Sequence, residues 1–134
     1  MRTHILEVRT QARTEFVPLS ARIAREAQSL LAGSGAILVY VPHTTAAVFV
    51  NEGADPDVMG DMGRVLDRLV PWDSSTYRHS EGNTAAHVKS VLIGPSVTVP
   101  VLEGKLRLGR WQEIFFCEFD GPRTRQVEVQ FLPG

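Results

Sequence analysis

The sequence predicts an α+β fold: a single domain with a mixed, mostly antiparallel sheet and two or three helices. The first observation behind this prediction is the order of elements, roughly ββαββααβββ, in which strand-like segments follow one another and helices do not alternate regularly with strands. The second is that no internal repeat, low-complexity tract or linker divides the 134 residues. A doubly wound parallel sheet would show strands and helices in regular alternation, so we exclude it.

Two short strands and a helix are predicted at the N-terminal end. Residues 4–8 and 15–19 have strand composition, and Pro18 closes the second strand because proline cannot donate to a ladder. Ser20 is the expected cap of a helix that Gly33 stops. The apolar positions of this helix follow helical spacing: Ile23, Ala24, Ala27, Leu30 and Leu31.

The middle of the chain contains two apolar runs of strand length, at residues 36–41 and 46–50. We expect them to form a buried strand pair with a polar connection at residues 42–45. Asp55, with a proline behind it, is the expected N-cap of a second helix that ends at Pro71.

After a loop at residues 71–82, Asn83 can cap a short third helix, which Gly94 and Pro95 terminate. The remainder of the chain is rich in strands, beginning with an alternating segment at 96–101.

Two further C-terminal strands have different patterns. Residues 111–119 carry apolar groups on both faces, which predicts a central strand. Arg125, Val127 and Val129 alternate with polar residues, which predicts a half-buried strand beside a solvated face.

Charge and composition exclude several classes of partner. The chain has 14 basic and 15 acidic residues and a formal net charge of -1, with no run of Lys or Arg longer than two, so neither nucleic acid nor an anionic membrane is an expected partner. There is no basic-then-apolar leader and no 18-residue apolar stretch, and a single Cys cannot form an internal disulfide, so we expect a cytoplasmic protein. A core can form at this length without a metal, so any metal would serve chemistry.

Three histidines lie at the ends of predicted elements: His43 after a strand, His79 in a loop and His87 in the first turns of the third helix. A loop between His79 and His87 can fold the first back toward the second. The positive end of the helix dipole disfavours the imidazolium form of His87, and a neutral imidazole can bind a metal or accept a proton. No compact metal-protease signature fixes the geometry, so packed or surface histidines remain the alternative.

Carboxylates and amides lie close to these histidines in sequence. Asn51 and Glu52 end a buried strand and are hard to explain as a merely solvated loop. Glu81 can orient a histidine by accepting its N–H, or it can act as a general base. The alternative is that Glu81 is a loop carboxylate without a role in chemistry.

Phosphate, if bound, must be held by side chains or a helix N-terminus, because the sequence contains no phosphate-binding glycine loop. The candidate anion contacts are Lys89, Arg107, Arg110, Arg123 and Arg125. The more ordinary interpretation of the arginines is that they are solvated at strand ends, except for Arg123, which directly follows a Gly-Pro turn. Trp111 and Gln112 are candidate pocket residues, although a core position for the tryptophan is the simpler alternative.

Taken together, these segments resemble the YjbQ-like family, a group of small bacterial and archaeal proteins often labelled secondary thiamine-phosphate synthases. The segments that carry the resemblance are His43-Thr44-Thr45-Ala46-Ala47, Asn51-Glu52, Asp55-Pro56-Asp57, Tyr77-Arg78-His79, Glu81-Gly82-Asn83, Ala86-His87-Val88-Lys89, residues 96–101, Gly109 with Trp111-Gln112, and residues 118–123.

The resemblance implies a homotrimer with its pocket near the histidine cluster, at or beside the subunit interface. It also implies a weak synthase activity that joins hydroxymethylpyrimidine diphosphate to thiazole phosphate with loss of pyrophosphate. Relatives usually have threonine where this chain has Arg110, which is expected to alter affinity or substrate if that threonine contacts the ligand.

Our leading hypothesis is therefore an enzyme that acts on a small phosphorylated substrate. Its catalytic groups are expected to be His43, Asn51, Glu52 and Glu81, and its substrate contacts Asn83, Lys89, Trp111, Gln112 and Arg123. A divalent metal held by His43, His79 and His87 is expected to be Zn²⁺ or a similar ion, since Mg²⁺ prefers oxygen ligands. The rivals are a non-enzymatic trimer that binds a metal or metabolite, and a purely structural trimer.

Overall fold

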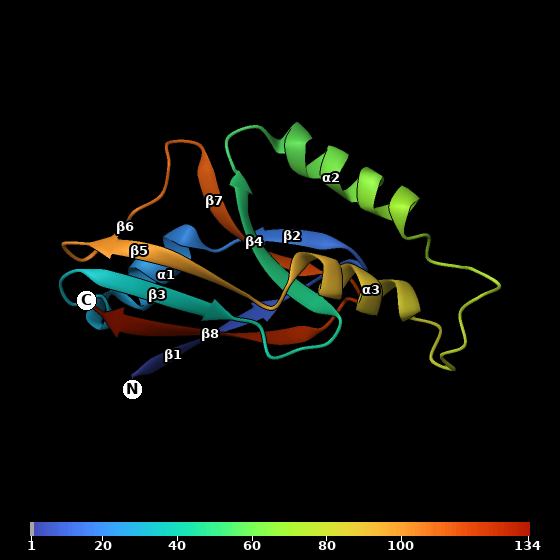
Figure 1. The fold of residues 1–134 in the computed structure, drawn as a ribbon, viewed down its shortest axis with the longest axis horizontal. Coiled ribbons are helices and arrows are strands. Elements are labelled where there is room, and N and C mark those ends of the chain that lie inside the picture. The colour runs from blue at the N-terminus through green and yellow to red at the C-terminus, as the bar shows by residue number, and fades with distance from the viewer. Residues whose placement is uncertain (1) are drawn as a thin grey trace.

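In the computed structural model, which describes residues 2–134, the chain folds into two antiparallel sheets with helices packed beside them (Figure 1). The first sheet has the strand order β1-β8-β3-β5-β6, and the second has the order β2-β7-β4. The strands are β1 Thr3–Arg9, β2 Glu15–Pro18, β3 Gly35–Tyr40, β4 Ala46–Glu52, β5 Ser96–Leu102, β6 Lys105–Leu106, β7 Gln112–Glu118 and β8 Thr124–Pro133. The helices are α1 Ser20–Glu26, a 3-10 turn Gln28–Leu30, α2 Pro56–Leu69 and α3 Thr84–Ile93.

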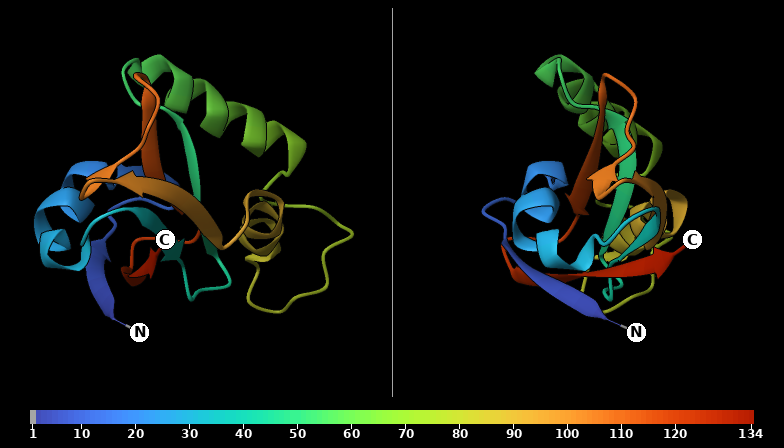
Figure 2. Two further views of the ribbon diagram at one scale, coloured as in Figure 1. Left: turned by 60° about the vertical axis from the view of Figure 1, so that its left-hand side comes forward. Right: turned by 90° about the vertical axis from the view of Figure 1, so that its left-hand side faces the viewer.

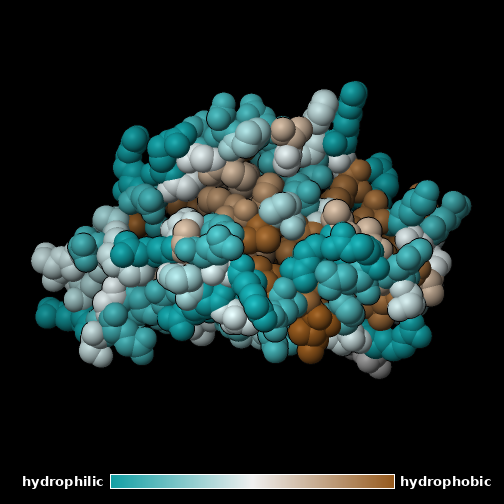
Figure 3. Space-filling view, turned by 180° about the vertical axis from the view of Figure 1, so that it is seen from behind, coloured by the Kyte–Doolittle hydropathy of each residue, from teal (hydrophilic) through white to brown (hydrophobic). Residues whose placement is uncertain are grey.

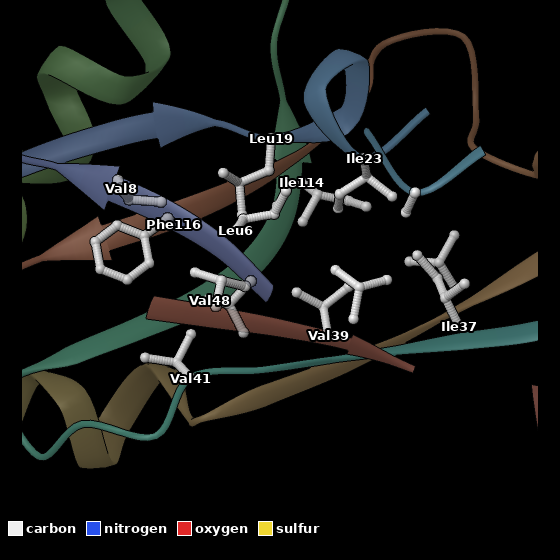
Figure 4. Packing of buried hydrophobic residues seen from close by; sticks show 14 of the residues in the cluster. Leu6, Val8, Leu19, Ile23, Ile37, Val39, Val41, Val48, Ile114 and Phe116 are labelled. Atoms are coloured by element: carbon white, nitrogen blue, oxygen red, sulfur yellow. The ribbon is translucent and has the colours of Figure 1, made fainter. Parts of the chain in front are cut away.

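The main hydrophobic core lies between the two sheets (Figure 4). Leu6 of β1 and Val39 of β3 contribute from one sheet, and Ile114 and Phe116 of β7 contribute from the other; all four are fully buried. Fully burying a side chain of this size stabilises the fold by about 1.5–3 kcal/mol. The alternation of inward and outward side chains along each strand thus places apolar groups on the two sheet faces that pack together.

A second, smaller core lies on the opposite face of the β2-β7-β4 sheet, against α2 and α3. Successive residues of β4 divide between the two cores, since Val48 faces the other sheet while Ala47 packs with Leu66 of α2. Cys117 belongs to this second core, and burial raises the pKa of its thiol. The prediction that β7 is central is confirmed, because it lies between β2 and β4 and is buried on both faces.

The helix boundaries follow local signals in two of three cases. The Asp55 carboxylate accepts the N–H of Asp57 at 2.9 Å and caps α2, as predicted. α3 begins after Asn83 and ends at Gly94, at the predicted positions, although the Asn83 side chain makes no capping hydrogen bond. Ser20 is not a cap. Its hydroxyl instead accepts the N–H of Ile114 at 3.0 Å, which ties α1 to β7.

The predicted pairing of the two apolar runs, 36–41 and 46–50, is wrong. They form β3 and β4, which belong to different sheets: β3 pairs with β5 and β8, and β4 pairs with β7. The polar connection at residues 42–45 crosses from one sheet to the other, so the domain has two sheets where one was expected. The α+β class itself is confirmed.

Figure 2 shows α2 on the outside of the molecule, joined to α3 by a long connection that loops away from the sheets. Among residues 2–134, no helix is both long enough and apolar enough to cross a membrane.

Candidate functional site

One cavity of about 690 Å³ lies where several chain segments end together. The β3–β4 connection borders it on one side, the loop before α3 and the first turn of α3 on another, and the β7–β8 turn on a third. Among the residues singled out from the sequence, those that line this cavity include His43, His79, Glu81, Asn83, His87 and Arg123.

His79 and His87 form a pair at the cavity. Their ring centroids are 5.4 Å apart and the rings are nearly perpendicular, at 87°. The loop does therefore fold His79 back onto the start of α3, as the sequence predicted. Oε2 of Glu81 lies 4.0 Å from Nε2 of His79, which is an ion-pair distance when the ring is protonated but too long for a hydrogen bond.

A backbone hydrogen bond fixes the tautomer of His43. The N–H of Gln126, on β8, donates to Nε2 of His43 at 3.0 Å. Burial lowers the pKa of His43, and the positive charges of Arg125 and Arg123 lower it further. Because a neutral imidazole carries a single N–H, an acceptor at Nε2 leaves the proton on Nδ1. His43 is thus a neutral donor through Nδ1.

A buried ion pair reaches the cavity through one of its two partners, Arg125. Glu118, at the end of β7, is fully buried, and Arg125, on β8, is 5% exposed and lines the cavity. Nε of Arg125 donates to Oε1 of Glu118 at 2.9 Å, and Nη2 donates to Oε2. Thr10 donates to Oε1 at 2.8 Å and the N–H of Asp120 to Oε2 at 3.0 Å, so each carboxylate oxygen accepts two hydrogen bonds. Nη2 of Arg125 also donates to the Thr45 hydroxyl at 2.8 Å.

Asp120 connects two other cavity residues. One of its oxygens, Oδ2, accepts both Nδ2 of Asn83 at 2.8 Å and Nη2 of Arg123 at 2.9 Å. Nε of Arg123 donates to the Asp120 carbonyl at 2.8 Å. The side chain of Asn83 is therefore a bridge between α3 and the β7–β8 turn, where a helix-capping role was expected.

Lys89 does not lie at the cavity, so its predicted role as a phosphate contact is wrong. It is 3% exposed, its ammonium is paired with Asp67 of α2, and it lies 5.9 Å from the centre of the Phe119 ring. Residues two apart on a helix point to opposite sides, so the face that presents His87 to the cavity turns Lys89 toward α2. Lys89 ties the two helices together.

Four other candidates lie at the far end of the second sheet. Asn51 and Glu52 end β4, and the register pairs them with the start of β7, directly after Trp111. The cavity is at the opposite end of both strands, about 20 Å away at 3.3 Å per residue. Trp111 is 55% exposed, so neither a place in this cavity nor the core position is correct.

At this far end the side chains make mostly local contacts. Oε1 of Gln112 accepts the N–H of Gly109 at 2.7 Å, and Oε2 of Glu52 accepts that of Ala54 at 2.9 Å. Arg110 lies over the Trp111 ring at 4.6 Å and is remote from the cavity. Arg110 therefore does not touch a ligand bound in the cavity of its own chain.

The three histidines share a cavity without forming a three-ligand metal centre in this arrangement. Within the described residues, no group of three His, Cys, Asp or Glu side chains lies close enough together to hold a metal ion. Nε2 of His43 already accepts a hydrogen bond, so the ring carries its one N–H on Nδ1. While that hydrogen bond is kept, Nδ1 can bind a metal only by losing this proton, which would leave the ring as an imidazolate anion. His79 and His87 alone supply two imidazoles, and we derive no chemical step through a metal.

Sequence reasoning missed Glu118 and Asp120 as site residues and gave Arg125 the more ordinary interpretation of a solvated arginine. One signal was present, because Arg125 falls in phase with the inward-facing Val127 and Val129. A charged residue at an inward strand position requires a buried partner of opposite charge. Glu118 lies in an otherwise apolar segment and is that partner.

The state of His43 gives a pH prediction. Its pKa in the folded chain lies below the ordinary value of 6.5, so between the two values the unfolded chain binds more protons. Its contribution to stability is complete above the ordinary value and is lost progressively as the pH falls from that value through the lower pKa of the folded chain. We expect an NMR titration of the His43 ring protons to show a midpoint below 6.5, and His43→Gln to flatten the dependence of unfolding free energy on pH in this window. A midpoint at or above 6.5 would refute the assignment.

Comparison with known proteins agrees with this architecture. A family model described as UPF0047 protein YjbQ-like matches residues 4–134. UPF0047 protein YugU of Bacillus subtilis is 47% identical over 127 residues, which cover 95% of this chain and 96% of that protein. A UPF0047 protein of Methanocaldococcus jannaschii is 41% identical over 128 residues, which cover 94% and 91%.

Solved structures show the same fold. A hypothetical protein from Aeropyrum pernix K1 superposes with a TM-score of 0.92 at 36% identity and covers 100% of both chains. A conserved YjbQ/UPF0047 protein from Clostridium acetobutylicum gives a TM-score of 0.92 at 38% identity, covering 96% of this chain and 99% of that one. With the family model and these relatives matching it nearly end to end, the chain belongs to the YjbQ/UPF0047 family.

Proposed function

We propose that the cavity binds a small phosphorylated metabolite and catalyses a transfer reaction of the thiamine-phosphate synthase type. The observation that carries the proposal is the convergence of three imidazoles, Glu81 and Arg123 from separate segments of the chain on one cavity. Its volume, about 690 Å³, lies in the range of small-molecule sites. A structural role alone does not require these groups to line an open cavity.

In the proposed reaction, the bond between the pyrimidine methylene carbon and a pyrophosphate oxygen breaks. The thiazole nitrogen supplies the electron pair for the new carbon–nitrogen bond, and pyrophosphate leaves with the electrons of the broken bond. Negative charge grows on the leaving group, so donors placed against it lower the barrier. Arg123 and the Nδ1–H of His43 are suited to this role.

The other side of the cavity is suited to proton transfer. His79 and His87 lie edge to face, with the Glu81 carboxylate beside His79. A carboxylate that orients an imidazole sets the direction in which the ring presents its proton, which favours proton transfer to or from a bound substrate. We propose that His79 or His87 protonates the departing pyrophosphate, with Glu81 as the orienting group.

Replacing Glu81 tests the enzymatic role. Glu81→Gln keeps the size of the side chain but removes its charge, and we expect turnover with the two thiamine precursors to fall about 100-fold or more while substrate binding survives. Steady-state kinetics and calorimetric binding measure the two effects separately.

The matched control for this variant is Glu103→Gln, because Glu103 is exposed on the β5–β6 turn and does not line this cavity. Unchanged turnover in Glu81→Gln would mean that the carboxylate has no catalytic part. Binding without any turnover in the wild type would favour the non-enzymatic, metabolite-binding alternative.

We also propose that the chain assembles as a homotrimer. Support comes from α2 and α3, which expose an unusual number of large apolar side chains. These are Val65 at 49%, Leu69 at 69%, Val88 at 39%, Val91 at 82% and Leu92 at 60% exposed. Seen from behind the view of Figure 1, the surface also shows patches of hydrophobic side chains near its middle (Figure 3).

The mass in solution tests this assembly. We expect light scattering to give about three times the chain mass of 14.8 kDa. A charge placed in an apolar interface is costly, so Val91→Asp with Leu92→Asp is expected to shift the protein toward the single-chain mass. Leu102→Asp, at an exposed site on β5, is the control and should leave the mass unchanged. A wild type that stays at 14.8 kDa at micromolar concentration would contradict the trimer.

A further inference from the structure

Hydrogen bonds hold only one edge of the Arg125 guanidinium group, the edge formed by Nε and Nη2. Nε and Nη2 are committed to Glu118 and Thr45, whereas the structure shows no hydrogen bond from Nη1 to any of residues 2–134. Within the described residues, three fully enclosed side-chain polar atoms lack a hydrogen-bond partner, and they belong to His4, Asn83 and Thr84. Nη1 of Arg125 is not one of them, so it is not fully enclosed. Because Arg125 lines the cavity, Nη1 is open to it.

Arg123 repeats this arrangement two residues earlier. Its Nε and Nη2 are held by the carbonyl and the carboxylate of Asp120, and its Nη1 makes no hydrogen bond within the described part of the chain. Both arginines line the same cavity. Both also lower the pKa of His43, as expected if the two guanidinium groups lie on its side of the cavity.

We infer that Arg125 and Arg123 together form the phosphate-binding wall of the cavity, with Arg125 as the buried anchor and Glu118 as the residue that positions it. The ligand class is a phosphate or pyrophosphate oxyanion. The inference rests on the proposed function and adds the orientation of the substrate in the cavity. Phosphate faces β8, and the reacting carbon faces the pair His79 and His87.

Recognition at this wall depends on directed hydrogen bonds more than on net charge. Glu118 and Asp120 already offset the charges of the two arginines. What remains for a ligand is the fixed pair of open Nη1 groups, whose geometry is set before any anion arrives. Arg125→Lys keeps the positive charge and its attraction to Glu118, but it loses the planar guanidinium and with it the Nη1 donor.

The experiment is a calorimetric titration of the full chain with inorganic pyrophosphate. We expect Arg125→Lys to weaken binding by about tenfold or more, and Arg123→Gln to weaken it as well. Arg107→Gln, an exposed arginine outside the cavity, is the control and should bind like the wild type. Circular dichroism establishes that each variant is folded.

A second measurement needs no substitution of Arg125. In ¹⁵N-labelled wild type, the guanidinium resonances of Arg125 and Arg123 should shift as pyrophosphate is added, while that of Arg107 stays in place. If pyrophosphate binds but the Arg125 resonances do not move, or if folded Arg125→Lys binds like the wild type, the inference is wrong and the proposed function stands. If the wild type binds no pyrophosphate at all, the phosphorylated-substrate function fails with it.

Discussion

The buried ion pair between Glu118 and Arg125 is the interaction on which the site depends. Placing a carboxylate and a guanidinium between two sheets costs several kcal/mol per ion unless their hydrogen bonds are satisfied. Here each oxygen of Glu118 accepts two, from Arg125, Thr10 and the Asp120 backbone. Removing either charge leaves the other buried and unpaired, so we regard the pair as a requirement of this end of the fold.

The geometry of the cavity follows from the partners of this pair. Thr45, bonded to Arg125, fixes the β3–β4 connection that carries His43, and the Asp120 backbone, bonded to Glu118, fixes the β7–β8 turn that carries Arg123. Asp120 in turn holds Asn83, directly before the helix that carries His87. Three segments far apart in the sequence are thereby connected through one buried charge pair, which explains how an open cavity keeps a defined shape.

Part of this arrangement could be predicted from the sequence, because it depends on local signals. Asp55 followed by proline identified the start of α2, and the two-sided apolar pattern identified β7 as central. The approach of His79 to His87 followed from a short loop before a helix. These features are set within about a dozen residues of chain.

The errors arose where long-range pairing decides the outcome. Two apolar runs joined by four polar residues look the same whether they pair with each other or cross between sheets, and β3 and β4 do the latter. The charge of Lys89 favours a phosphate contact, but its helical phase turns it away from the cavity. Sequence alone does not reveal that one strand length separates Trp111 from the cavity with the histidines.

We propose that this cavity holds the phosphate of a substrate against β8 and its reacting carbon against the histidine pair. A crystal structure of the chain with a non-reactive hydroxymethylpyrimidine diphosphate analogue would show this orientation. We expect phosphate oxygens within about 3 Å of the arginine Nη1 atoms, and the methylene carbon facing His79 and His87. An analogue bound elsewhere, for example beside Trp111 of the same chain, or bound here with the opposite orientation, would contradict it.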